Sequence, residues 1–204
     1  MNLSRLRRRW LRPLVRDPLI LPFYVPSFLV FLGFGFITPV LPIYVESFEV
    51  SYRWVGLVLS AQAFGMLISD LPNGLLLRRV GHKRAMLLGI GTLVLARLAF
   101  SWAGSVSELL IYRLLSGFGM SLYGVARHAF VAGRAKAATR GRALALFGGL
   151  MRIGRFIGPL IGGYLAAALG LRYSFVVSGV VSALGVFFVV YFVPGRQSEK
   201  TAAV

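Results

Sequence analysis

The chain has 204 residues, of which 57% are hydrophobic and 14% charged, and its mean hydropathy is +0.77. This composition excludes a soluble domain, whose surface needs far more charge. The net charge of +17 would suit a nucleic-acid binder, but the basic residues lie between apolar stretches, so we expect no nucleic-acid partner. The chain has no cysteine, and His82 and His128 lie far apart with few acids nearby. We therefore expect no metal, no cofactor and no enzyme chemistry.

The basic run from Arg5 to Arg16 precedes the first apolar stretch, as in a signal peptide. That stretch is too long for a signal peptide and lacks a small-x-small cleavage site, so we expect a retained membrane helix. Apolar runs between polar breaks predict an all-α membrane protein with six spans. These spans lie near residues 19–45, 54–77, 85–103, 108–132, 143–169 and 171–194. The predicted organisation is a basic N-terminus over 1–18, a bundle over 19–194, and a polar tail over 195–204.

Lysine and arginine gather in alternate connections between the spans. They are Arg5, Arg7, Arg8, Arg9, Arg12, Arg16, Arg78, Arg79, Lys83, Arg84, Arg127, Arg134, Lys136, Arg140, Arg142, Arg196 and Lys200. The intervening connections carry only Arg53 and Arg172. Because short basic loops stay in the cytoplasm, we expect a multi-pass protein of the cell membrane with both termini cytoplasmic. The positive charge is then a topology signal.

The connection after the second span reads Gly-Leu-Leu-Leu-Arg-Arg-Val-Gly-His-Lys-Arg, from Gly74 to Arg84. It resembles the G-x-x-x-D-R-x-G-R-R/K loop between the second and third helices of major facilitator superfamily transporters. The matching positions are Gly74, Arg79, Gly81 and Lys83, while Arg78 replaces the acid of the family pattern. Gly81 permits a tight turn, and the cations favour the anionic cytoplasmic face. The resemblance implies a cytoplasmic gate, and the alternative is an orientation signal alone.

The fourth span contains Arg113, followed by Gly117 and Gly119, and resembles the second motif of the same family. At about 100° per residue, Arg113 shares a helical face with Gly117, Met120 and Gly124. A charge near the membrane interior costs about 2.5–3.5 kcal/mol on insertion scales, so a watered cavity would suit it. The resemblance implies a role in proton coupling. The alternative is an arginine that extends to the outer interface.

The fifth span resembles the antiporter motif of the family, G-x-x-x-G-P-x-x-G-G. The matching residues are Gly154, Gly158, Pro159, Gly162 and Gly163. Gly154, Gly158 and Gly162 form a stripe along which another helix can approach closely. The resemblance implies export by antiport, whereas passive helix packing is the alternative.

Asp70 is the only carboxylate well inside a predicted span. An acid in such a place can load and release protons, or it can pair with Arg113 or a basic loop. Against this acid stand Arg97, Arg113, Arg152 and Arg155 within spans. We expect Arg97 to extend outward and Arg152 to face a central cavity. This excess of arginine requires negative charge or water from elsewhere.

The first span carries several phenylalanines beside glycines. They are Phe28, Phe31, Phe34 and Phe36, with Gly33 and Gly35 among them. Such residues can form the apolar wall of a substrate site. Contact with lipid is the expectation for most of them.

Three motifs in the family order indicate the N-terminal half of a major facilitator transporter, a six-helix unit with a 3+3 inverted repeat. The resemblance implies a proton-coupled exporter of small organic molecules, similar to drug/proton antiporters. The partners implied are the lipid bilayer, a small-molecule substrate, the proton, and a second six-helix half or a homodimer partner. The chain is then a truncated frame or a half-transporter that pairs, and the tail resembles the start of the inter-half linker. The unbalanced arginines and a glycine stripe left exposed would both call for that second half. A non-transporting membrane partner is the alternative.

Overall fold

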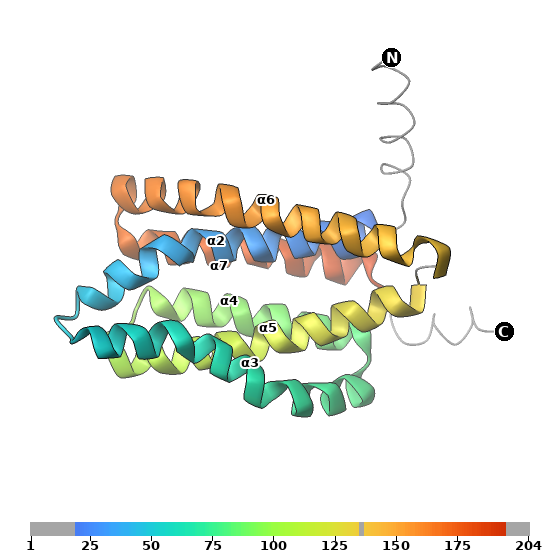
Figure 1. The fold of residues 1–204 in the computed structure, drawn as a ribbon, viewed down its shortest axis with the longest axis horizontal. Coiled ribbons are helices and arrows are strands. Elements are labelled where there is room, and N and C mark those ends of the chain that lie inside the picture. Colours follow the sequence, from blue (N-terminus) through green and yellow to red (C-terminus); the bar gives the residue numbers. More distant parts are fainter. Residues whose placement is uncertain (1–18, 135–136, 195–204) are drawn as a thin grey trace, which may run out of the picture.

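A computed structural model describes residues 19–134 and 137–194. Within these ranges all regular secondary structure is helical (Figure 1). A short π-helical turn, η1 (Ile20–Tyr24), leads into α2 (Val25–Glu46), and the helices that follow are α3 (Tyr52–Val80), α4 (His82–Phe100), α5 (Val106–Arg134), α6 (Ala137–Leu169) and α7 (Leu171–Phe192). The predicted basic N-terminus, the tail and Lys136 lie outside the described residues, as does the side chain of Arg140.

Five of the helical segments are long and apolar enough to cross a membrane. They are Ile20–Glu46, Tyr52–Val80, Val106–Arg134, Gly141–Leu169 and Leu171–Phe192. The remaining helix, α4, has 19 residues and carries Lys83, Arg84 and Arg97. Its charge content explains why it falls outside this set, although it occupies the position predicted for the third span. The all-helical membrane fold is confirmed at the level of these five segments.

Two tight turns in the bundle are formed by single glycines. Gly81 joins α3 to α4 with φ 81°, and Gly170 joins α6 to α7 with φ 100°. Side chains disfavour this left-handed region of backbone space, whereas glycine enters it freely. The tight turn predicted at Gly81 is confirmed.

The helices pack as two groups of three. In one group α2 lies against α6 and α7, and in the other α5 lies against α3 and α4, while α4 and α7 join the two groups. Buried apolar side chains form one cluster around Phe23, Met86 and Phe130, and a second around Leu41, Phe100 and Phe175. The two clusters occupy opposite ends of the bundle.

The glycine stripe of α6 packs inside the chain. A Cβ atom at Gly158 would lie 2.6 Å from the Cα atom of Gly35, and one at Gly162 would lie 2.6 Å from the Cα atom of Phe36. Both partners belong to α2. The expectation that this stripe is exposed and waits for a second half is therefore wrong, because α2 already covers it.

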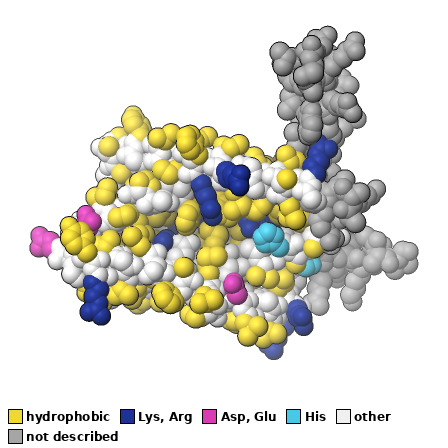
Figure 2. Space-filling view, viewed as in Figure 1, with side chains coloured by type: hydrophobic (Ala, Val, Ile, Leu, Met, Phe, Trp, Pro, Cys, Tyr) yellow, Lys and Arg dark blue, Asp and Glu magenta, His cyan; other side chains and the backbone are white. Residues whose placement is uncertain are grey.

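The two ends of the bundle differ in charge. The turn at Gly81, the connection between α5 and α6, and the ends of the described chain lie at one end (Figure 1). Arg78, Arg79, Arg84 and Arg134 lie there, and the opposite end carries the acidic residues Glu46, Glu49 and Glu108. Figure 2 shows apolar side chains covering much of the surface between them. The alternation of basic connections thus gives one basic end of the bundle.

Candidate functional site

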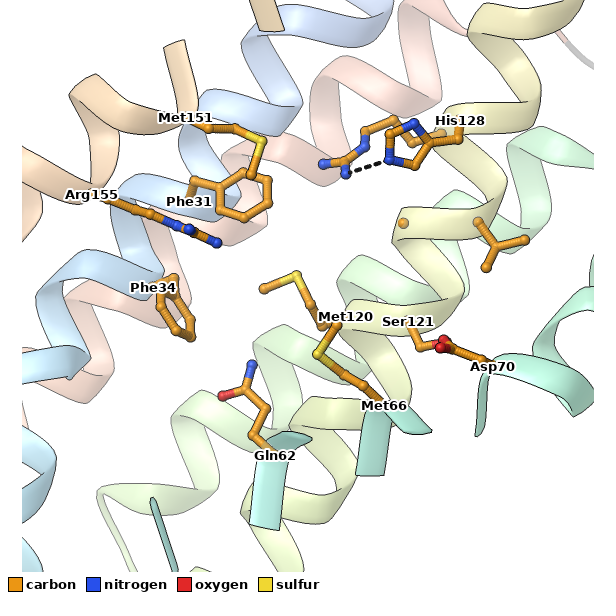
Figure 3. Close-up of a pocket in the computed structure, with 13 residues that line it drawn as sticks. Phe31, Phe34, Gln62, Met66, Asp70, Met120, Ser121, His128, Met151 and Arg155 are labelled. Atoms are coloured by element: carbon orange, nitrogen blue, oxygen red, sulfur yellow. Dashed lines mark hydrogen bonds between the residues drawn. The ribbon is translucent and has the colours of Figure 1, made fainter. Parts of the chain in front are cut away.

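A cavity of about 560 Å³ lies between the two helix groups (Figure 3). Its lining residues come from α2, α3, α5 and α6. They are Phe31, Phe34, Gln62, Met66, Asp70, Met120, Ser121, Gly124, Val125, Arg127, His128, Met151 and Arg155. The cavity is therefore built from both groups of three helices.

Methionine and phenylalanine form the apolar part of the lining. Three of the five methionines of the chain, Met66, Met120 and Met151, line the cavity from three different helices. Methionine is unbranched and polarisable, so it fits ligands of different shapes. Phe31 and Phe34 add aromatic surface from α2. The expectation of lipid contact does not hold for these two phenylalanines, nor for Phe36, which is buried.

A polar network joins α3 to α5 at the cavity wall. The hydroxyl of Ser121 donates to Oδ1 of Asp70 at 2.5 Å and accepts from Nδ2 of Asn73 at 2.9 Å. Asn73 also donates to the carbonyl oxygen of Phe118 at 3.2 Å. Asp70 is exposed and lines the cavity, so its carboxylate is accessible while Ser121 fixes its orientation (Figure 3).

Two arginines line the cavity on the side of α2 and α6. The guanidinium carbons of Arg127 and Arg155 each lie 5.4 Å from the ring centroid of Phe31. Nη2 of Arg127 donates to Nε2 of His128 at 3.3 Å, because a guanidinium has no acceptor. The cavity thus combines apolar surface, one carboxylate and two arginine cations.

Arg113 does not line this cavity. Its side chain is buried, with 9% of its surface exposed, and it donates from Nε to the carbonyl oxygen of Val58 and from Nη2 to that of Leu59, each at 3.4 Å. Both acceptors belong to α3. Arg113 therefore neither faces the cavity nor extends to the outer interface, because it is held between α5 and α3.

Arg97 is also buried, with 2% of its surface exposed, so the expectation that it extends outward is wrong. It donates to the hydroxyl of Ser182 on α7 and to the carbonyl oxygen of Val30 on α2, the latter at 3.1 Å. A Cβ atom at Gly33 would lie 2.7 Å from Nη1 of Arg97. Gly33 thus provides the space that lets this arginine bridge α4, α7 and α2.

Arg152 is exposed and is not among the lining residues, whereas Arg155 is. Met151 and Arg155 are four residues apart and share a face of α6, while Arg152 is rotated by about 100° from Met151. This cavity thus contains Arg155 of the fifth span in place of Arg152, which was predicted to face a central cavity. The helical phase of α6 is set by its packing on α2, which the local sequence does not specify.

A family comparison identifies the fold. The family model of the Major Facilitator Superfamily matches residues 24–204. The chain belongs to the major facilitator superfamily. It is therefore a multi-pass membrane protein of a transporter family, as the three motifs predicted.

Known relatives agree with this assignment. The chain is 29% identical over 155 residues to multidrug resistance protein 2 of Bacillus subtilis (strain 168), an alignment that covers 76% of this chain and 38% of that protein. It is 25% identical over 181 residues to quinolone resistance protein NorA of Staphylococcus aureus (strain MRSA252), covering 88% and 46%. The crystal structure of peptide transporter POT in complex with sulfate has the same fold, with a TM-score of 0.77, 18% identity, and coverage of 92% and 42%. The chain spans less than half the length of these proteins.

The superfamily loop motif lies at the basic end of the bundle, apart from the cavity. Nζ of Lys83 donates to the carbonyl oxygen of Val190 near the end of α7, at 2.6 Å. Gly74 has open space where a Cβ atom would lie, and Arg78 and Arg79 are exposed. None of the five motif residues lines the cavity. Within this motif, Lys83 therefore links α4 to α7, while the face of α3 at Gly74 has no neighbouring helix against it among the described residues.

Several cavity residues were missed at the sequence level. Arg127 was assigned to the basic connection after the fourth span, although α5 continues to Arg134. A signal was present, because Met120, Gly124 and Arg127 recur at helical spacing on one face of α5. Gln62 belongs to none of the motifs, so the sequence offered no reason to select it. Its Oε1 atom is buried without a hydrogen-bond partner in the described part of the chain.

Proposed function

We propose that this chain forms one six-helix half of a major facilitator transporter that exports small, mainly apolar organic molecules in exchange for protons. The cavity supports the proposal, because both three-helix groups contribute to it and its lining combines apolar side chains with a single carboxylate and two arginines. Relatives named for multidrug and quinolone resistance support organic molecules as the substrate class. Both termini would be cytoplasmic in the cell membrane, with the basic end of the bundle inside.

The helix contacts support a 3+3 inverted repeat with six spans. Exchanging α2, α3 and α4 for α5, α6 and α7 maps the α2–α6 contact onto α5–α3 and the α2–α7 contact onto α5–α4. The α4–α7 contact maps onto itself. Such repeats occur within each half of the superfamily fold, with the substrate site between the halves. A second half would then complete the cavity and leave Gly74 to Lys83 as a cytoplasmic gate.

Asp70 is the proposed proton-binding group. It lines the cavity, and Ser121 ties it to α5, so its protonation can alter the contact between α3 and α5. Arg113 would act indirectly, by holding α3 against α5 through the carbonyl groups of Val58 and Leu59. Arg152 has no role in this scheme. Gly154, Gly158, Pro159, Gly162 and Gly163 would set the contact of α6 with α2.

The test is export from proteoliposomes with an imposed pH gradient. The chain is reconstituted alone and together with the C-terminal six-helix half of the Bacillus subtilis relative, and the neutral fluorophore N-phenyl-1-naphthylamine serves as the substrate. We expect gradient-driven export only with the second half, and loss of its gradient dependence in Asp70→Asn. Glu46→Gln, at the acidic end, is the matched control and should retain it. Export that ignores the gradient in every preparation would rule out antiport.

A further inference from the structure

Two cations from different helices converge on one aromatic ring at the cavity wall. Arg127 of α5 and Arg155 of α6 each place the guanidinium carbon 5.4 Å from the centroid of Phe31. Figure 3 shows Arg155, Phe31 and Phe34 grouped on the same side of the cavity. Arg155 also lies 5.9 Å from the centroid of Phe34. Two like charges thus lie around the same ring beside an open volume.

The charge of Arg127 is not balanced within the described part of the chain. The side chain is 5% exposed, and its Nε and Nη1 atoms are buried without a hydrogen-bond partner. Besides Phe31, its guanidinium carbon lies 5.2 Å from the ring centroid of Tyr123 and 4.2 Å from that of Phe147. Aromatic faces stabilise a cation by about 0.5–2 kcal/mol, and they leave its net charge in place.

The rest of the lining does not supply the missing negative charge. Asp70 is the only carboxylate among the lining residues, and it accepts the hydroxyl of Ser121 on the wall formed by α3 and α5. Figure 3 shows Asp70 and Arg155 on opposite sides of the cavity. His128 accepts a hydrogen bond from Arg127 through Nε2 and adds no counter-charge. Two arginines therefore face one carboxylate across apolar surface.

We propose that the cavity selects apolar molecules that carry a carboxylate. The exposed guanidinium of Arg155 binds the carboxylate, and Arg127, fixed by its three rings, supplies the positive charge behind it. The apolar body of the molecule lies along Met66, Met120 and Met151. An arginine fork matches a carboxylate with two parallel hydrogen bonds, and an apolar setting strengthens that pairing. This inference rests on the proposed function, since it names the substrate class of the same cavity.

The test compares two probes that share a ring system and differ in charge, 2-naphthoate and 2-naphthylmethylammonium. Binding to the full chain in nanodiscs of zwitterionic lipid is measured by equilibrium dialysis, with empty nanodiscs subtracted. We expect 2-naphthoate to bind at least about tenfold more tightly than the ammonium probe, in line with a charge-assisted pair. Equal affinities, or tighter binding of the ammonium probe, would overturn the proposal.

Variants locate the effect in the cavity. Arg155→Gln should weaken 2-naphthoate binding about tenfold and leave the ammonium probe unchanged or tighter. Arg172→Gln removes an exposed arginine outside the cavity and should change neither affinity. Arg127→Gln should also weaken 2-naphthoate binding, and Arg155→Gln keeps the test valid if the loss of Arg127 disturbs folding. If the preference for the anionic probe persists in both cavity variants, it arises from the basic surface, and the proposed carboxylate site is wrong.

The two proposals fail separately. Gradient-driven export of the neutral fluorophore without an anion preference would remove this inference and leave the transport function intact. A preference for the anionic probe without export would support the carboxylate site and contradict the transport function.

Discussion

The α3–α5 and α2–α6 interfaces are built on the same kind of contact. In each, two glycines face one another, Gly65 with Gly117 and Gly35 with Gly158. The inverted-repeat relation proposed above would make these two interfaces equivalent. Their glycine contacts let the helix backbones approach closely, which in a membrane increases packing between helices.

The two interfaces differ in their polar contacts. Four side chains form hydrogen bonds between α3 and α5, namely Asp70, Asn73, Arg113 and Ser121. On the α2–α6 side, the hydroxyl of Tyr24, the residue just before α2, donates to the carbonyl oxygen of Ala143 on α6 at a long 3.4 Å. Because lipid offers no hydrophobic drive for helix association, α2–α6 depends mainly on close packing, whereas α3–α5 combines packing with several hydrogen bonds. Widening the two interfaces should therefore have different costs.

The largest effect is expected for Gly117→Ala. Its Cβ atom would lie 2.8 Å from the Cα atom of Gly65 and 2.8 Å from the backbone nitrogen of Met66, so α3 and α5 must separate. Overpacking costs about 1–3 kcal/mol, and each interhelical hydrogen bond lost adds about 0.6 kcal/mol, so the free energy of unfolding should fall by about 2–4 kcal/mol. Unfolding by SDS in mixed micelles measures it. Gly124→Ala on the same helix has open space and should cost nothing; equal losses in both variants would contradict the glycine contact.

Gly158→Ala should have a smaller effect. Its Cβ atom would lie 2.6 Å from the Cα atom of Gly35, and the hydrogen bond at risk when these helices separate is the long one from Tyr24 to Ala143. We expect a decrease of about 1–3 kcal/mol in the free energy of unfolding. Gly163→Ala, which meets nothing within 4 Å, is the control in the same motif. A larger loss for Gly158→Ala than for Gly117→Ala would reverse the comparison.

Much of the fold could be predicted from local sequence. The lengths of the apolar stretches predicted the helices, and Gly81 predicted a turn. The spacing of Gly154, Gly158 and Gly162 predicted a close helix contact. The partner of that stripe could not be predicted, because it depends on how α2 and α6 meet in space. The same limit applies to Arg97, whose acceptors are a hydroxyl and a backbone carbonyl group on two other helices. A backbone carbonyl acceptor cannot be recognised from the sequence, because every residue has one.

The candidate site was predicted less completely. Asp70 could be found because a lone acid in an apolar span is costly and conspicuous. Arg127 and Arg155 could not be singled out, since their joint approach to Phe31 requires the rotation of three helices to be known. Charge within one span indicates a need for a partner. It does not indicate whether the partner is a carboxylate, a carbonyl group or an aromatic ring.

The smallest effect is expected for Asn73→Ala, which separates hydrogen bonding from packing at the α3–α5 interface. Asn73 is fully buried, and its Nδ2 atom donates to Phe118 and Ser121, while its Oδ1 atom has no partner in the described part of the chain. Losing two interhelical bonds of about 0.6 kcal/mol each should lower the free energy of unfolding by about 1 kcal/mol. Removing the unpaired oxygen offsets part of that loss, because a buried acceptor without a donor is destabilising.

Ser60→Ala is the matched control for Asn73→Ala, because within residues 19–134 and 137–194 Ser60 bonds only to carbonyl groups of its own helix, at Gly56 and Leu57. Combining Asn73→Ala with Gly117→Ala should give less than the sum of the two losses, since a separated α3 has already lost the bonds of Asn73. Full additivity would mean that these bonds survive the separation. The greater sensitivity of α3–α5 to widening would then come from packing alone, because its hydrogen bonds would contribute equally before and after the helices separate.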